Sequence, residues 1–117
     1  AAHEKAARLE DGIFNRWFLD ALFKGDYPAD VLAALSAHMP EGWQDDMALI
    51  ARPLDWLGIN YYTRRRVLHD DGALWPHQAD AAPQLPVTDM GWEIYPEGLH
   101  HFLTRIHRDY SRGLPLS

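Results

Sequence analysis

The chain has 117 residues, of which 47% are hydrophobic and 24% charged, the size and composition of one folded domain rather than of a disordered tail. Seventeen acidic against eleven basic residues give a net charge of -6, which argues against a nucleic-acid-binding protein because such proteins neutralise phosphates with clustered Lys and Arg. No apolar stretch approaches the roughly 18 to 20 residues that span a bilayer, and cysteine is absent, so we expect a soluble, cytoplasmic protein of bacterial type without disulfides.

Three helices are expected in the first half of the chain. Apolar residues recur at spacings of four along residues 1–23, on two adjoining lines made of Leu9, Ile13, Trp17, Phe14, Phe18 and Leu22. This pattern predicts one helix with a wide aromatic face. Pro28 is suited to the first turn of a second, short helix. A third is expected over residues 45–51, where Pro53 disfavours continuation.

Residues 54–62 read differently from the helices before them. This stretch, Leu-Asp-Trp-Leu-Gly-Ile-Asn-Tyr-Tyr, is short, almost continuously apolar and rich in aromatic residues, which is typical of a buried parallel strand. We expect it to lack a partner within this chain. Because a lone strand cannot satisfy its backbone donors and acceptors, the sequence is interpreted as a segment of a larger α/β protein whose helices leave apolar faces open.

A long loop and a final helix are expected after this strand. Residues 63–89 carry charges and three prolines, with a strand-like run at 66–69 and a predicted hairpin turn at Asp70-Asp71-Gly72. The clearest helix covers residues 96–112, with Gly113 as a stop. Its apolar stripe consists of Leu99, Phe102, Leu103, Ile106 and Tyr110.

The seven histidines and the paired aspartates raise the question of a metal site. His100 and His101 are adjacent on the final helix and point about 100° apart, so a solvated helix face is favoured over a shared ion. Asp45-Asp46 and Asp70-Asp71 lack further carboxylates at the spacing of a calcium loop. We therefore expect neither a metal nor a cofactor.

Three stretches of sequence carry a pattern that extends over nearly the whole chain. They are Asn-Arg-Trp-Phe-Leu-Asp-Ala-Leu-Phe-Lys-Gly-Asp-Tyr-Pro at 15–28, Leu-Gly-Ile-Asn-Tyr-Tyr at 57–62, and Met-Gly-Trp-Glu-Ile-Tyr-Pro-Glu-Gly-Leu at 90–99. In this order and spacing they resemble glycoside hydrolase family 1, the β-glucosidase and β-galactosidase family.

The resemblance implies an α/β fold in which residues 1–117 form part of a single catalytic domain, a (β/α)8 TIM barrel, incomplete on its own. The segment would comprise the helical layer after strand five, strand six at 54–62, its long loop and following helix, and the start of strand seven at 114–117.

The resemblance also implies an activity, the retaining hydrolysis of terminal β-D-glucosides or related β-glycosides. One glutamic acid then protonates the leaving oxygen and a second acts as nucleophile. In the family the acid lies in an Asn-Glu-Pro motif and the nucleophile in a Glu-Asn-Gly motif. Neither motif occurs around the five glutamates present, Glu4, Glu10, Glu41, Glu93 and Glu97. Both catalytic residues are expected outside this chain, which would be inactive without the remaining segments of the barrel.

Three residues become candidates for substrate binding through the same resemblance. Asn60 and Tyr62 end the predicted strand, where barrel enzymes place their site residues. In resembling enzymes the second tyrosine of Asn-Tyr-Tyr hydrogen-bonds the nucleophile, so Tyr62 would support it and Asn60 would add a polar contact. Trp92 resembles the aromatic platform on the leaving-group side. Because neighbours alternate along a strand, Tyr61 is expected to face the helices.

Two other functions remain open at this point. One is a noncatalytic complementation or interaction fragment that docks on another chain through its strand edges. The other is a small carbohydrate-binding module that uses Trp75 and Trp92, which the lack of a closed set of strands disfavours.

Overall fold

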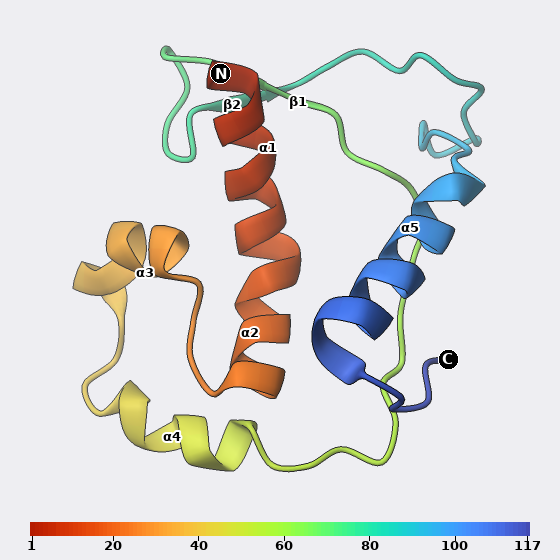
Figure 1. The fold of residues 1–117 in the computed structure, drawn as a ribbon. Helices are drawn as coiled ribbons and strands as arrows, with labels where there is room; N and C mark the ends of the chain where they lie inside the picture. The colour runs from red at the N-terminus through yellow and green to blue at the C-terminus, as the bar shows by residue number, and fades with distance from the viewer. The chain divides into compact units, whose positions relative to one another are not determined.

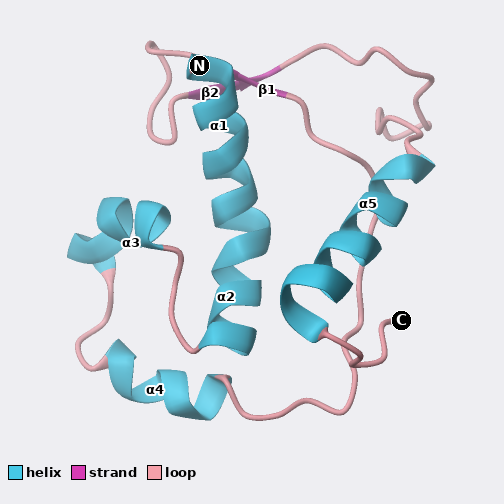
Figure 2. Cartoon of the chain, in the orientation of Figure 1, coloured by secondary structure: helices cyan, strands magenta, loops and turns pink.

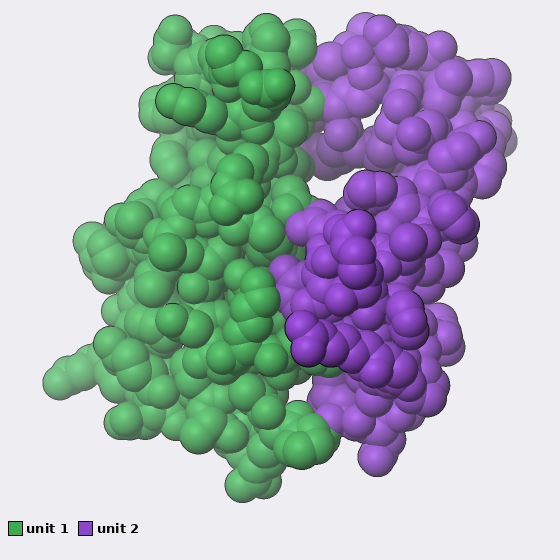
Figure 3. Space-filling model, viewed as in Figure 1, with its two compact units in different colours: residues 1–53, 67–79 green, residues 54–66, 80–117 purple.

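The computed structural model describes all 117 residues, which form two compact units. Unit 1 comprises residues 1–53 and 67–79, and unit 2 comprises residues 54–66 and 80–117 (Figure 3). Four helices come first, followed by a two-stranded sheet and a last helix (Figures 1 and 2). None of these helices combines the length and the apolar character that crossing a lipid bilayer requires.

The predicted first helix is present and runs almost without interruption from residue 2 to residue 24. It consists of α1 (Ala2–Asp11), the π-helical turn η1 (Gly12–Arg16) and α2 (Trp17–Lys24). The π turn was not predicted, and it shifts the spacing of four because it adds one residue to a turn. Phe14 and Phe18 are 57% and 60% exposed, so the aromatic face is open in this chain, as expected.

Two short helices follow, close to their predicted positions. Pro28 is extended, with ψ at 121°, and directly precedes α3 (Ala29–Leu35), which continues as the 3-10 turn η2 (Ser36–His38). The third helix, α4 (Trp43–Ile50), begins two residues earlier than predicted, after Gly42 in the left-handed conformation. Each of these two helices therefore starts directly after a residue whose own backbone is not helical, Pro28 or Gly42.

The apolar interior of unit 1 is small. Its buried apolar side chains are Ala6, Leu19, Ala21, Val31 and Met47, and Val31 alone among them is completely enclosed. The ring of Tyr27 stacks on Trp17 with centroids 4.0 Å apart and lies 5.2 Å from Trp43. Aromatic stacking thus supplements a limited core.

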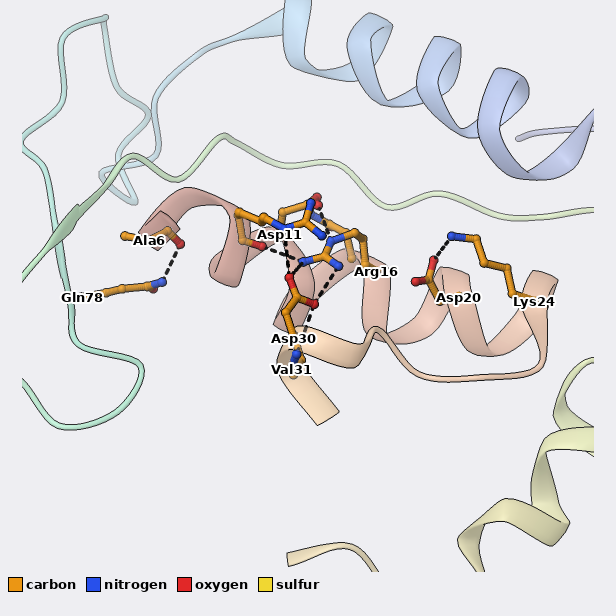
Figure 4. A network of polar contacts seen from close by, with 10 residues as sticks. Ala6, Asp11, Arg16, Asp20, Lys24, Asp30, Val31 and Gln78 are labelled. Atoms are coloured by element: carbon orange, nitrogen blue, oxygen red, sulfur yellow. Dashed lines mark hydrogen bonds and ion pairs between the residues drawn. The ribbon is translucent and has the colours of Figure 1, made fainter. Parts of the chain in front are cut away.

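A buried arginine links the first helix to α3. Arg16 is 8% exposed, and its guanidinium donates to Asp11 at 3.1 Å and to both carboxylate oxygens of Asp30 at 3.0 and 2.8 Å (Figure 4). It also donates to the carbonyl oxygen of Arg8 at 3.0 Å. The hydrogen bonds from Arg16 hold the pKa of Asp30 below its usual value. A methyl group at Gly12 would meet both Val31 and the guanidinium, which explains a glycine at the centre of this network.

The loop after residue 66 returns to unit 1 as a hairpin. Strand β1 (Val67–His69) pairs with β2 (Gln78–Asp80), in agreement with the strand-like run predicted at 66–69. The predicted turn at Asp70 is present, because its side chain accepts a hydrogen bond from the Gly72 amide at 2.9 Å. Gln78 donates to the carbonyl oxygen of Ala6 at 2.7 Å, which fixes the hairpin to α1 (Figure 4).

The stretch predicted as a strand, residues 54–62, is paired over part of its length. Leu57 forms a parallel bridge with Leu116. The amides of Leu57 and Ile59 donate to Pro115 and Ser117, at 2.9 and 2.7 Å, and Ser117 donates back to Leu57 at 3.0 Å. The expectation of no partner within the chain is therefore wrong, because residues 115–117 already supply three backbone hydrogen bonds.

The final helix is also present, as α5 (Pro96–Ile106) followed by the π-helical turn η3 (His107–Ser111). Arg112 and Gly113 end it with φ angles of 41° and 111°, next to the predicted stop. The first turn of α5 packs against the ring of Tyr61, which occupies the space that a side chain at residue 98 would need. A glycine at that position is thus required by close approach.

Candidate functional site

The candidate residues at the end of the paired stretch alternate in exposure. Asn60 and Tyr62 are exposed, and Tyr61 between them is half-buried. Tyr61 lies against α5, with its ring centroid 6.4 Å from that of Phe102 and its hydroxyl donating to the carbonyl oxygen of Tyr95 at 2.6 Å. Burial raises the pKa of Tyr61 above its usual value. The expectation that Tyr61 faces a helix is confirmed.

Trp92 is carried by a tight hairpin over residues 86–94. The amide of Gly91 donates to Thr88 at 2.8 Å, and Gly91 has a φ of 77°, a left-handed conformation that glycine adopts without strain. Beyond the turn, the Thr88 amide donates to the Trp92 carbonyl oxygen at 2.8 Å, and Val87 pairs with Glu93. The tryptophan is therefore the first residue after the turn, within the hydrogen-bonded part of the hairpin.

The structure brings Tyr62 and Trp92 together. Their ring centroids are 5.4 Å apart with the planes tilted by 50°, a favourable geometry for an aromatic pair. Tyr62 is 69% exposed and Trp92 36% exposed, so both rings keep accessible surface. Asn60 is exposed as well, and it takes no part in the ring pair.

A pocket of about 400 Å³ adjoins Trp92. Its walls include Thr63, the three arginines at 64–66, Asp80, Pro83 and Glu93. Arg65 is paired with Asp80 at 2.7 Å, and Arg66 donates to the carbonyl oxygen of Ala82 at 2.8 Å. These bonds hold residues 80–82 along the arginine run and so shape one wall of the pocket.

Glu93, the residue after Trp92, is buried and ionised. It is 6% exposed, and its carboxylate accepts hydrogen bonds from Arg64 at 2.5 Å and from the amides of Gln84 and Leu85 at 2.5 and 3.1 Å. The hydrogen bond from Arg64, supported by the two amides, lowers the pKa of Glu93 to about 2. Sequence reasoning did not single out this residue, because its charged partner lies 29 positions away.

The site combines the exposed rings of Tyr62 and Trp92 with charged side chains that are held in ion pairs. No group of three or more His, Asp or Glu side chains gathers in an arrangement suited to a metal ion. Glu97, the glutamate that follows Glu93, is exposed in the first turn of α5. The arrangement can stack on a sugar or an aryl ring through Tyr62 and Trp92, with a phenol hydroxyl available for hydrogen bonding.

Comparison with known proteins identifies the family. The model of Glycosyl hydrolase family 1 matches residues 1–116. The chain belongs to glycosyl hydrolase family 1. The relatives in this family that the chain resembles include a β-glucosidase from an Agrobacterium species, 38% identical over 109 residues, and β-glucosidase A from Thermotoga maritima, 38% identical over 101 residues. The matches cover 91% and 84% of this chain but only 24% and 22% of those relatives, so the chain spans about a quarter of their length.

Solved structures of family 1 enzymes give the same result for the fold. A β-glucosidase from Exiguobacterium marinum superposes with a TM-score of 0.86 at 33% identity, over 99% of this chain and 27% of that one. The family 1 β-glucosidase from Thermotoga maritima gives a TM-score of 0.85 at 35% identity. Helices, hairpin and final helix thus reproduce the backbone of a quarter of a family 1 β-glucosidase, and the expected kinship with these barrel enzymes is confirmed.

Proposed function

We propose that the chain forms part of the catalytic barrel of a retaining β-glycosidase that hydrolyses terminal β-D-glucosides or related β-glycosides. Family membership and the β-glucosidases among its relatives support this activity. The parallel contact between residues 57–59 and 115–117 supports their assignment as barrel strands six and seven, with α5 as the helix between them. Helices α1 to α4 then form the layer after strand five, and residues 1–117 belong to one catalytic domain.

The observation that carries the proposal is the exposed pair of Tyr62 and Trp92 next to a paired strand. In the proposed barrel, the Tyr62 hydroxyl hydrogen-bonds the nucleophilic glutamate, keeps it ionised and holds it in line for attack. Trp92 offers its indole face to the sugar or aglycone on the leaving-group side, and Asn60 adds a polar contact to the substrate.

Both catalytic glutamates are proposed to come from parts of the barrel outside these residues. We therefore expect the remaining segments of the barrel to bind this chain. Large apolar side chains that are exposed here support such a contact: Phe14, Phe18, Trp56, Leu74 and Met90. The same surface favours a second function, a noncatalytic complementation fragment. Mixing the 117-residue chain with the separately produced remainder should restore hydrolysis of a chromogenic β-glucoside that neither piece cleaves alone.

The role of Tyr62 is tested in the full-length protein that carries these residues, with steady-state kinetics on an aryl β-glucoside. Tyr62→Phe should lower kcat about 10- to 100-fold, the value of a hydrogen bond to a charged group, with a smaller change in KM. Tyr61→Phe is the comparison variant, because its hydroxyl bonds a backbone carbonyl and not the nucleophile, and it should lower kcat much less than Tyr62→Phe does. Equal kcat values for the Tyr62→Phe variant and the parent would refute the role.

A further inference from the structure

Four contacts tie the end of the paired stretch to the segment that carries Trp92. The Tyr61 hydroxyl donates to the Tyr95 carbonyl oxygen at 2.6 Å, and the Thr63 hydroxyl donates to the Glu93 carbonyl oxygen at 2.9 Å. Arg64 donates to the Glu93 carboxylate at 2.5 Å, and its guanidinium lies 4.2 Å from the centroid of the Tyr95 ring. On one segment these contacts lie on both sides of Tyr62, and on the other they begin at the residue directly after Trp92.

Among the groups in these four contacts, the Glu93 carboxylate also bonds residues of a third segment. Besides Arg64 it accepts from the amides of Gln84 and Leu85, which begin the segment that leads into the Trp92 hairpin. One buried side chain therefore connects the start of this segment, at Gln84 and Leu85, with Arg64 after the paired stretch. Trp92 directly precedes Glu93, so these bonds restrain the backbone next to the indole ring.

The bonding pattern requires an ionised carboxylate. All three partners of Glu93 are donors, namely a guanidinium N–H and two backbone amides. A glutamine side chain of the same size has one oxygen acceptor and an NH2 group, which is itself a donor. Glu93→Gln would place that donor against at least one other donor, in a position that is only 6% exposed.

We infer that Glu93 is a positioning residue that fixes the Trp92 ring beside Tyr62 and thereby sets the preference of the enzyme for the leaving group. This inference rests on the proposed function, in which Trp92 faces the leaving group. Glu93 takes no part in proton transfer or attack. Its effect reaches the substrate only through the indole ring.

The decisive experiment compares Glu93→Gln with the parent full-length protein on two substrates. For an aryl β-glucoside, whose leaving group can stack on Trp92, kcat/KM should fall about tenfold. For β-glucosyl fluoride, whose leaving group is a single atom, it should change less than about twofold. Glu97→Gln is the matched control, since Glu97 is exposed, and should change neither value. Equal losses on both substrates would overturn the inference.

A double variant tests whether the effect passes through Trp92. If it does, Glu93→Gln combined with Trp92→Ala should behave like Trp92→Ala alone, because the ring to be positioned is already absent. Independent, additive losses would contradict this route. Should Glu93→Gln fail to fold, Arg64→Lys keeps the positive charge but loses the guanidinium geometry, and it should show the same selective loss on the aryl substrate.

A measurement without turnover separates this inference from the proposed function. The fluorescence of Trp92 is obtained as the difference between the parent and Trp92→Phe, and its quenching by acrylamide reports the exposure of the ring. The same difference is taken in each variant, with and without Trp92→Phe. Quenching of the Trp92 fluorescence should be greater in Glu93→Gln than in the parent, and it should be unchanged in Glu97→Gln. Unchanged quenching in both would overturn the positioning role even in an active enzyme. Absence of β-glucosidase activity in the parent would overturn the proposed function, and with it the effect on the leaving group, while the quenching would still test whether Glu93 positions Trp92.

Discussion

Each unit contains a buried charged side chain with several hydrogen bonds, Arg16 in unit 1 and Glu93 in unit 2, and these two charges have opposite signs. In unit 1 the Arg16 guanidinium is 8% exposed and donates to two carboxylates and a backbone carbonyl. In unit 2 the Glu93 carboxylate is 6% exposed and accepts from one guanidinium and two backbone amides. Both groups form several hydrogen bonds within the chain, as a buried charge requires.

Arg16 and Glu93 differ in the kind of structural element that their hydrogen-bond partners belong to. Arg16 connects η1 to the first turn of α3, so its partners are regular helices and none of them is a candidate site residue. Glu93 connects irregular segments, and it adjoins Trp92 while its partner Arg64 lies two residues after Tyr62. The inferred role of Glu93 therefore depends on where its partners lie, next to candidate site residues, whereas the partners of Arg16 only join helices.

The largest effect on stability is expected at Arg16. Arg16→Met should lower the free energy of unfolding of the full-length protein by about 2 to 3 kcal/mol, because Asp11 and Asp30 lose their shared partner while staying partly buried. Arg8 also pairs with Asp30, at 3.0 Å, but its side chain is 67% exposed. Arg8→Met should cost less than about 1 kcal/mol by urea unfolding. Equal losses would show that burial does not distinguish the two arginines.

A smaller effect is expected where α5 meets Tyr61. Gly98→Ala places a methyl group where the Tyr61 ring now lies, and overpacking of this kind costs about 1 to 3 kcal/mol. The loss should appear in thermal unfolding and should be reduced when Tyr61→Phe removes the hydroxyl that the methyl group meets first. A double variant no more stable than Gly98→Ala would show that the close approach is not the cause.

The pH dependence of stability isolates the Glu93 carboxylate. Its pKa in the folded protein is about 2, below the usual 4.5, so folding favours the ionised form. The resulting stabilisation is complete above about pH 4.5 and is lost as the pH falls toward 2. Glu93→Gln should remove this part of the dependence. The difference between the urea midpoints of parent and variant should therefore shrink between pH 5 and pH 3, and a constant difference would contradict the lowered pKa.

Sequence patterns predicted the helices well because local residues decide where helices start and stop. Pro28 and Gly42 directly precede helix starts in the structure, and Gly113 follows the end of the last helix. The π turn at Gly12–Arg16 was missed, since periodicity assumes one residue spacing throughout, and the contact of Arg16 with Asp30 in a later helix was missed as well. Local signals do not contain such partners.

The candidate site was predicted in part for the same reason. Alternation along an extended segment correctly separated Tyr61 from Asn60 and Tyr62, because it depends only on backbone geometry. The functional roles of Asn60, Tyr62 and Trp92 came from the family resemblance and stay predictions. Glu93 was missed, because its significance arises from amides and a guanidinium that only the fold brings together.

The parallel contact between Leu57 and Leu116 also has a consequence for the order of folding. It closes a loop of about sixty residues, and the entropy cost of closure must be met before its hydrogen bonds contribute. The helices of unit 1 form through contacts between near neighbours and are expected to appear earlier. Pulse-labelling hydrogen exchange should then show late protection of the Leu57 and Ile59 amides. The segment that carries Tyr62 would become ordered last, after helices that contribute none of the candidate site residues.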